Sequence, residues 1–317
     1  MNDSLFKIDF EAAGQRIQCF RFSHNAMATA FEIFIQHDNL KYAKQAANEA
    51  FELLDNLERL LSSYIPNSDI SRISNLKRGQ SAIIGIDAFD SLKQCKKIYR
   101  LTNGTFDITI GTLLEERNKY DKAENIDESK LKRMVSQIGC DKFSLSENDF
   151  TYKLNADKLK LDMGGFGKGY GIDKMAHLLA EDWDIRKVLI QGGHSTFLAL
   201  ENPDSSPGWP VIISDPVDRK KILSTPLLKN YSISASGLEK GDHIINPANG
   251  NPVSDKSAAW STAPQAALCD ALSTAFMVMD QPLIESFCKK NTDIAAMIFF
   301  NDERNLMKFN WDKFYKN

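Results

Sequence analysis

Residues 27–36, MATAFEIFIQ, are followed after a short gap by residues 41–62, KYAKQAANEAFELLDNLERLLS. The first segment is rich in apolar, β-branched and aromatic residues, a composition typical of a β-strand. The second places alanine, leucine and phenylalanine at the three- and four-residue spacing of one helical face. The two segments therefore predict a strand followed by a long amphipathic helix.

Helices and strands alternate irregularly over the rest of the chain. The sequence shows no βαβ rhythm, no internal repeat and no Pro/Gly/Ser-rich linker. This order predicts an α+β fold, with one large mixed α/β domain of two lobes. The further predicted elements are helices at 87–102, 128–139, 266–279 and 283–290 and one from the glycines near residue 170 to Trp183; strands at 158–163, 187–191, 209–214, 231–235 and 294–300; a turn at 64–68; and a polar loop at 120–130.

The composition is that of a globular protein with a slight negative charge. Of 317 residues, 43% are hydrophobic and 26% are charged, and 39 basic against 42 acidic residues give a net charge of −3. The charge balance excludes the basic surface used to bind nucleic acid or anionic membranes, and no apolar run is long enough for a transmembrane helix. The N-terminus shows no signal peptide or lipobox and the five cysteines are scattered, so we expect a cytoplasmic protein with reduced thiols.

The densest run of glycines is LDMGGFGKGYG, residues 161–171. Glycines let the backbone approach a ligand closely, and a helix that starts here offers N–H groups to an anion. The run matches neither the dinucleotide fingerprint nor the P-loop. On this segment alone, phosphate binding and a tight strand-to-helix turn both remain open.

Two further places carry side chains suited to chemistry. Asp270 and Thr274 are four residues apart on the predicted helix 266–279, so they share one face and offer oxygen ligands to a hard cation such as Mg²⁺; local hydrogen bonding is the other interpretation. His243 lies in GDHIINPANG, residues 241–250, before a turn. A histidine at a strand edge is a candidate general base or an ordinary surface residue, and His194 is the second candidate.

Several short segments occur in a fixed order: MAT (27–29), LSSY (61–64), SDISRI (68–73), GTFDITIG (104–111), LDMGGFGKGYGID (161–173), GG (192–193), SG (236–237), HII (243–245) and DALST (270–274). Together they resemble the FAD:protein FMN transferases, the ApbE flavin transferase family. The resemblance covers roughly residues 22–300. It implies a T-fold-like architecture, with the family domain at residues 22–317 and an N-terminal extension at residues 1–21.

Members of this family use Mg²⁺ to cleave FAD and attach FMN by a phosphodiester bond to a Thr or Ser of a target flavoprotein, with release of AMP. The resemblance therefore implies FAD as substrate, Mg²⁺ as cofactor and a flavoprotein as partner. From the charge balance and the hydropathy we expect neither nucleic acid nor a membrane as a partner. Asp270, Thr274 and the backbone carbonyl of Gly165 match the metal ligands, and His243 matches the base that activates the acceptor hydroxyl. The positions that match the FAD site are Met27, Tyr64, Thr105, Phe106, Asp107, Asp162, Lys168 and Ile245.

The chain departs from the family pattern in the loop after His243. The usual HIIDPxTG is HIINPANG here, so Asn246 stands in place of Asp and a negative charge is lost. Three functions stay open on the sequence: the flavin transferase, a Mg²⁺-dependent FAD pyrophosphatase in which water replaces the protein hydroxyl, and an FAD-binding protein with weakened catalysis.

Overall fold

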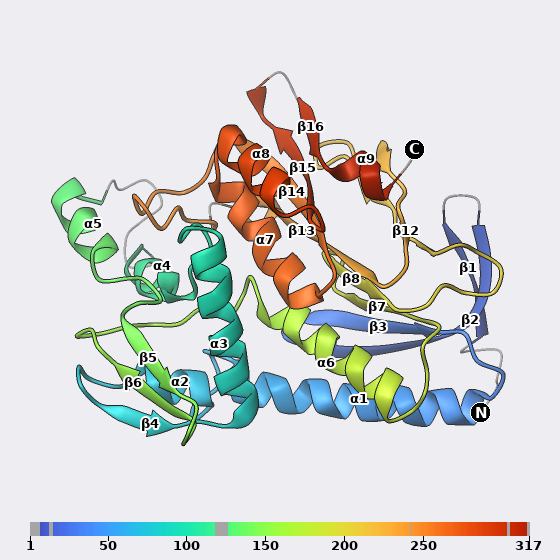
Figure 1. Ribbon diagram of the computed structural model, residues 1–317, viewed down its shortest axis with the longest axis horizontal. Coiled ribbons are helices and arrows are strands. Elements are labelled where there is room, and N and C mark those ends of the chain that lie inside the picture. The colour runs from blue at the N-terminus through green and yellow to red at the C-terminus, as the bar shows by residue number, and fades with distance from the viewer. Residues whose placement is uncertain (1–6, 13–14, 118–125, 242, 303–304, 316–317) are drawn as a thin grey trace.

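The computed structural model describes residues 7–12, 15–117, 126–241, 243–302 and 305–315 (Figure 1). Its main element is a sheet in the order β1-β2-β3-β7-β8-β13-β14-β15-β16, in which neighbouring strands pair antiparallel. The strands are β1 (Lys7–Ala12), β2 (Gln15–Ala26), β3 (Thr29–Ile35), β7 (Val188–Gly192), β8 (Thr196–Ala199), β13 (Tyr231–Gly237), β14 (Lys256–Ala263), β15 (Ala295–Phe300) and β16 (Leu306–Phe309).

Helices cover one face of this sheet. In Figure 1, α1 and α6 run across the β2–β3 end and α7 lies over β13 and β14, in agreement with the packing between these elements. No helix within the described ranges has both the length and the apolar composition of a membrane span. The helices on this face are α1 (Leu40–Leu61), α6 (Gly167–Glu181), α7 (Ala266–Val278) and α8 (Gln281–Lys290). The short helix α9 (Trp311–Phe314) packs on the opposite face, where Trp311 is buried in a cluster with Trp209.

Strand β3 shows how the sequence divides the two faces of the sheet. Phe31, Ile33 and Ile35 are buried in the cluster that includes α1 and α6. Phe34 points to the opposite face and belongs to a second cluster with Trp209. Successive side chains along a strand point to opposite faces of the sheet. A strand with apolar residues at both odd and even positions is therefore covered on both faces.

A second lobe, at the left of Figure 1, is built around a small sheet in the order β4-β6-β5. Short two-stranded pairs also follow β8, where β9 pairs with β12 and β10 with β11. The elements of the lobe are α2 (Asp69–Ser74), β4 (Ser81–Ile83), α3 (Ile86–Leu101), η2 (Ile108–Ile110), α4 (Gly111–Arg117), α5 (Glu128–Val135), β5 (Phe143–Ser146) and β6 (Thr151–Leu154). The remaining elements are β9 (Trp209–Pro210), β10 (Ile213–Ser214), β11 (Ile222–Ser224), β12 (Leu227–Leu228) and η3 (Leu238–Lys240).

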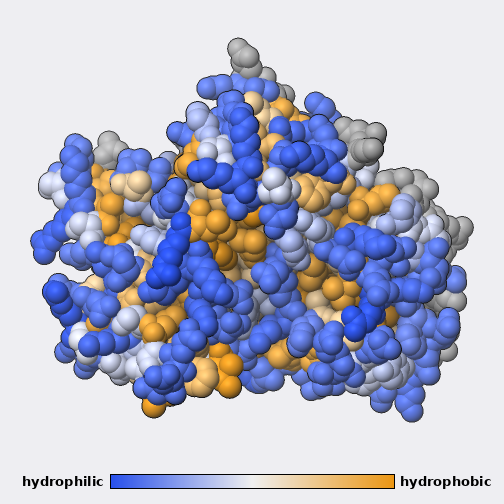
Figure 2. Space-filling model, in the orientation of Figure 1, coloured by the Kyte–Doolittle hydropathy of each residue, from blue (hydrophilic) through white to orange (hydrophobic). Residues whose placement is uncertain are grey.

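One core connects the two lobes. Leu92 and Ile98 of α3, Tyr152 of β6 and Phe276 of α7 are buried in the same apolar cluster. Figure 2 shows apolar residues along the junction between this lobe and helices α6 and α7. The predicted α+β class and the single domain of two lobes are therefore confirmed.

Most predicted elements are confirmed to within a few residues. The predicted helices correspond to α1, α3, α5, α6, α7 and α8, and the predicted strands to β3, β7, β13 and β15. Asn103 and Gly104 both have positive φ and follow α3, as the predicted helix end requires. Residues 120–125 of the predicted polar loop lie outside the described residues.

The strand predicted at 158–163 is wrong, because this stretch is irregular chain. Its backbone N–H groups find partners outside any sheet: Lys160 donates to the Thr112 hydroxyl at 2.9 Å, and Asp162 donates to the carbonyl of Ile108 at 2.7 Å. Alternating apolar residues here mark chain that packs into the core between the lobes and pairs with no strand.

Two further differences concern strands. The strand predicted at 209–214 is split into β9 and β10. β2, β8 and β14 were not predicted, although β14 is a buried strand near the centre of the sheet. The predicted boundary between residues 21 and 22 falls within β2, so residues 7–12 and 15–21 contribute paired strands to the main sheet.

Candidate functional site

The glycine-rich segment forms the turn into α6 and lets that helix pack directly on α7. Helix α6 begins at Gly167, shortly after Gly164 and Gly165. A Cβ at Gly169 would lie 2.2 Å from the carbonyl oxygen of Ala266, so glycine is needed where the first turns of the two helices meet. The contact places the N-terminus of α6, whose first N–H groups have no partner within the helix, beside the side chains of α7 (Figure 1).

Asp270 is buried on the second turn of α7. Its Oδ1 accepts hydrogen bonds from Ser234 Oγ at 3.1 Å and from Thr196 Oγ1 at 3.3 Å, and its Oδ2 accepts one from the N–H of Gly169 at 3.2 Å. The ammonium of Lys168 lies 3.3 Å and 3.2 Å from the two oxygens. A carboxylate removed from water needs such partners, and here strands β8 and β13 and the start of α6 supply them.

Thr274 is one helical turn beyond Asp270 on the same face of α7. Its hydroxyl is 3.1 Å from Ser236 Oγ, which is also 2.8 Å from Ser273 Oγ. A Cβ at Gly165 would lie 2.9 Å from Thr274 Oγ1, so the missing side chain leaves the hydroxyl uncovered and brings the glycine backbone against it. The three positions predicted as metal ligands therefore lie together.

The chemistry of this donor group fits a hard divalent cation. A carboxylate, a hydroxyl and a backbone carbonyl are oxygen ligands of the kind that Mg²⁺ prefers, and Gly165 leaves room for a ligand beside Thr274. Asp270 is its one anionic member, and no three Asp, Glu, His or Cys side chains of the described ranges gather in a way that could hold a metal. A cation here would need further anionic oxygens, which the phosphates of a nucleotide supply.

The Thr105-Phe106-Asp107 segment reaches the same place through its aromatic ring. Phe106 is buried, and its Cε2 would lie 3.6 Å from a Cβ at Gly165. Asp107 caps the short helix η2, because its Oδ1 accepts from the N–H and the hydroxyl of Thr109 at 2.8 Å and 2.7 Å. Burial raises the pKa of Asp107, and the Thr109 bonds oppose that rise. The hydroxyl of Thr105 donates to a backbone carbonyl at the end of α3.

Tyr64 lines a cavity of about 200 Å³ in the second lobe, together with Lys160 and Leu161. The residue is 89% exposed, so its ring offers a face for stacking on a flat ring system. Asp162 directly follows Leu161, which lines this cavity, and the Oδ1 of Asp162 accepts a hydrogen bond from the N–H of Gly164 at 2.7 Å. This stretch of chain joins the Tyr64 cavity to the glycine turn.

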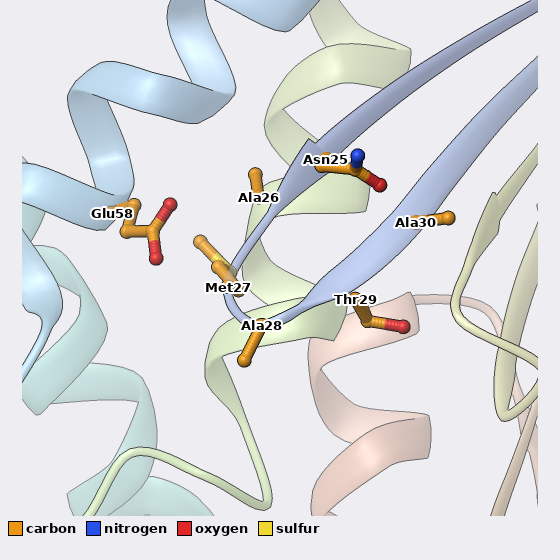
Figure 3. Close-up of a pocket in the computed structure, with 7 residues that line it drawn as sticks. All are labelled: Asn25, Ala26, Met27, Ala28, Thr29, Ala30 and Glu58. Atoms are coloured by element: carbon orange, nitrogen blue, oxygen red, sulfur yellow. The ribbon is translucent and has the colours of Figure 1, made fainter.

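Met27 is at the tip of the β2–β3 hairpin, on an open cavity of about 430 Å³ that Thr29 and Glu58 also line. Met27 and Ala28 both have positive φ, 49° and 57°, as a tight hairpin turn requires. In Figure 3, Met27 lies on the side of Glu58 and Thr29 points the opposite way. The Cε of Met27 would lie 3.6 Å from a Cβ at Gly171, so Met27 contacts α6.

His243 lies on the loop after η3 and is exposed. Its Nδ1 is 2.8 Å from the carbonyl oxygen of Gly241. Because a carbonyl only accepts, this contact assigns the proton to Nδ1 and leaves Nε2 as the nitrogen able to take a proton. Ile245 is buried in the cluster with Leu113 and Leu131, and so anchors the loop beneath the exposed histidine.

The candidate residues thus fall into groups. Lys168 contacts Asp270, and Gly165 lies beside Thr274 and Phe106. Met27 and Tyr64 line two separate cavities, and His243 lies on an exposed loop. The hydroxyls of Thr196 and Ser234 were not predicted, and Ser236 entered only as part of the SG segment (236–237). For the two serines the signal is the alternation in YSISASG (231–237), which places a serine at every second residue and so points all three serines of β13 to the same face.

The protein is therefore an antiparallel α+β protein in which oxygen donors gather where the N-termini of α6 and α7 meet. The ApbE family model matches residues 27–298, so the chain belongs to the ApbE family. A FAD:protein FMN transferase of Buchnera aphidicola is 30% identical over 246 residues, which cover 71% of this chain and 70% of that protein. A FAD:protein FMN transferase of Vibrio cholerae is 23% identical over 294 residues, which cover 87% and 86%.

Solved structures agree on the fold. The ApbE protein of Thermotoga maritima superposes with a TM-score of 0.83 at 18% identity, and the match covers 95% of this chain and 100% of that one. The flavin transferase ApbE of Vibrio cholerae gives a TM-score of 0.82 at 20% identity, covering 94% and 99%.

Proposed function

We propose that this chain is a Mg²⁺-dependent FAD:protein FMN transferase, which cleaves FAD and attaches FMN by a phosphodiester bond to a Thr or Ser of a target flavoprotein. The names of its relatives support the enzyme class. The observation that carries the proposal is the meeting of Gly165, Lys168, Asp270 and Thr274 at the start of α6 and on α7. Cations and helix N-termini together are suited to a diphosphate.

Asp270, Thr274 and the carbonyl of Gly165 would hold Mg²⁺. When bound, the ion would neutralise charge on the diphosphate, which is the main requirement of phosphoryl transfer. The buried bonds from Ser234 and Thr196 keep the Asp270 carboxylate in one orientation.

His243 would act as the base. Its Nδ1 proton is held by the Gly241 carbonyl, so Nε2 is free to accept the proton of the acceptor hydroxyl. The deprotonated oxygen then attacks the FMN phosphorus, and the bond to the leaving AMP breaks. The exposed position of His243 suits this role, because the acceptor arrives on another protein.

The remaining predicted residues would bind FAD. Tyr64 offers an exposed ring beside a cavity, and Met27 lines a second, larger hollow at the hairpin. The residues that would shape this binding region are Thr105, Phe106, Asp107, Asp162 and Ile245.

The test is to incubate the purified protein with FAD and Mg²⁺, with and without proteins extracted from the source cells. We expect FAD to bind, AMP to be released, and an acceptor band to fluoresce in a denaturing gel. EDTA and the Asp270→Asn variant are the controls. AMP with free FMN and no adduct would instead indicate the pyrophosphatase, and bound FAD without AMP would indicate a binding protein.

A further inference from the structure

Lys168 occupies an electrostatically unusual position. It is the second residue of α6, and its ammonium lies 3.2 Å and 3.3 Å from the Asp270 oxygens and 3.4 Å from the carbonyl of Gly164. A positive charge is unfavourable at the first turn of a helix, so the helix dipole does not stabilise the ammonium in this position. What holds it is the Asp270 carboxylate, which would otherwise be a buried charge without a counter-ion.

Lys168 is also the partner of Asp270 that can leave. The other donors are fixed by the fold: the N–H of Gly169 is backbone, and Ser234 and Thr196 are buried on strands. The Lys168 side chain is 23% exposed against 3% for Asp270, and it ends a flexible stem. Its contacts are longer than the 2.7–2.9 Å typical of a charge-assisted hydrogen bond. A cation that reaches Asp270 would therefore displace Lys168 and leave the other bonds in place.

We propose that Lys168 and Mg²⁺ are alternative counter-ions of Asp270, and that the pyrophosphate of FAD drives the exchange by receiving the displaced ammonium. Without FAD, a metal ion at this site must separate Lys168 from its carboxylate and then share the pocket with it. With FAD, the diphosphate offers Lys168 a new anionic partner at the start of α6. Mg²⁺ and FAD should therefore bind cooperatively, and each should raise the affinity for the other by the same factor.

This inference rests on the proposed function, because it takes the diphosphate of FAD as the ligand. The test is calorimetric titration of MgCl2 into the wild-type protein and Lys168→Met, each with and without FAD, in the absence of an acceptor protein. In the wild type we expect FAD to raise the Mg²⁺ affinity by about tenfold or more. In Lys168→Met we expect tighter Mg²⁺ binding without FAD. We also expect a clearly smaller coupling factor than in the wild type, because only the part that the phosphate oxygens supply as direct ligands remains.

Lys174→Met is the matched control, because Lys174 lies on the same helix and pairs with the carboxylate of Asp87 at 2.8 Å. It should behave as the wild type does. Thermal unfolding gives an independent readout: Lys168→Met should melt at a lower temperature than the wild type without metal and gain more from MgCl2. Lys168→Gln, whose amide still donates to the carboxylate, provides a second variant if Lys168→Met does not fold.

Equal Mg²⁺ affinity and equal coupling in the wild type and the Lys168 variants would overturn the exchange and leave the proposed metal site standing. No Mg²⁺ binding to any of these proteins, with or without FAD, would overturn both the exchange and the metal site.

Discussion

Two parts of the candidate site differ in how the fold holds them. Asp270 is buried on α7, and groups from β8, β13 and α6 all point to its carboxylate. His243 is exposed on a loop, and the carbonyl of Gly241, two residues earlier, holds its imidazole. Several neighbouring elements hold the Asp270 carboxylate, whereas the position of the His243 imidazole is set by its own loop.

This difference between the two regions predicts which substitutions lower stability and which lower activity. A buried carboxylate with several donors contributes to the fold as well as to the site, so its loss leaves those donors unpaired. An exposed side chain on a loop contributes little to the free energy of unfolding. Substitutions in the first region should therefore lower both stability and activity, and substitutions in the second should lower activity alone.

Asp270→Ala should have the largest effect. Lys168 loses its counter-ion and the donors from Ser234, Thr196 and Gly169 lose their acceptor, so we expect the free energy of unfolding to fall by about 3 kcal/mol. FMN transfer should fall below detection. Urea unfolding and the in-gel fluorescence of the acceptor measure the two effects. Wild-type stability together with full transfer at saturating Mg²⁺ would contradict the role of this region.

His243→Ala comes next, with an effect on transfer alone. Loss of a general base lowers a rate by about 10²–10⁴-fold. Because His243 is exposed, the free energy of unfolding should stay within about 0.5 kcal/mol of wild type, and FAD titration should give an unchanged affinity. His37→Ala is the matched control, since His37 is also an exposed histidine outside any helix or strand and has no proposed role. Unchanged transfer in His243→Ala would show that another group activates the acceptor.

The fold class was predictable because its main helices have clear periodic patterns. The spacing of alanine and leucine in α1 predicted its bounds to within one residue. β14 was missed because KSAAWSTA is a run of small residues with no apolar–polar alternation, and its burial depends on the α7 helix that covers it. The strand prediction at 158–163 was wrong for the opposite reason, since this segment has strand-like alternation of apolar residues but no neighbouring strand to pair with.

The site residues could be predicted from the sequence only where they belong to a motif within one element. Asp270 and Thr274 share a helix face, so their spacing alone brings them together. That Lys168 would reach Asp270, 102 residues away, depends on the packing of α6 against α7 at Gly169. Thr196 and Ser234 join the site through sheet pairing between β8 and β13, which the sequence does not reveal.

Asp173 makes the stability of the Asp270 region depend on pH, because its carboxyl group caps the N-terminus of α7, the helix that carries Asp270. Its carboxylate accepts from the N–H groups of Ala266 and Ala267 at 2.8 Å each. Burial, with a smaller contribution from the charge of Asp270, raises the pKa of Asp173 to about 6 against the opposing effect of these bonds. The folded protein therefore binds this proton more tightly than the unfolded chain, so this contribution to stability is lost as pH rises from about 4 to about 6.

Asp173→Asn removes that titration. Measured by urea unfolding in EDTA, the stability of the wild type relative to the variant should fall by on the order of 2–3 kcal/mol between pH 4 and pH 7. A constant difference between the two proteins across this range would show that the carboxylate titrates as an ordinary aspartate.

Asn246→Asp should have the smallest effect, although it restores the acidic residue that the family carries in this loop. The Oδ1 of Asn246 accepts from the N–H of Ala248 at 2.9 Å and so closes a local turn. A carboxylate accepts the same hydrogen bond, and His243 already has its Nδ1 held by the carbonyl of Gly241. We therefore expect transfer to stay within about threefold of wild type, and the free energy of unfolding within about 0.5 kcal/mol. If Asn246→Asp instead raised transfer tenfold or more while His243→Ala abolished it in both backgrounds, the carboxylate would be acting on the histidine. The loop would then be organised by charge, as the Asp270 region is, and the contrast between the two regions would no longer hold.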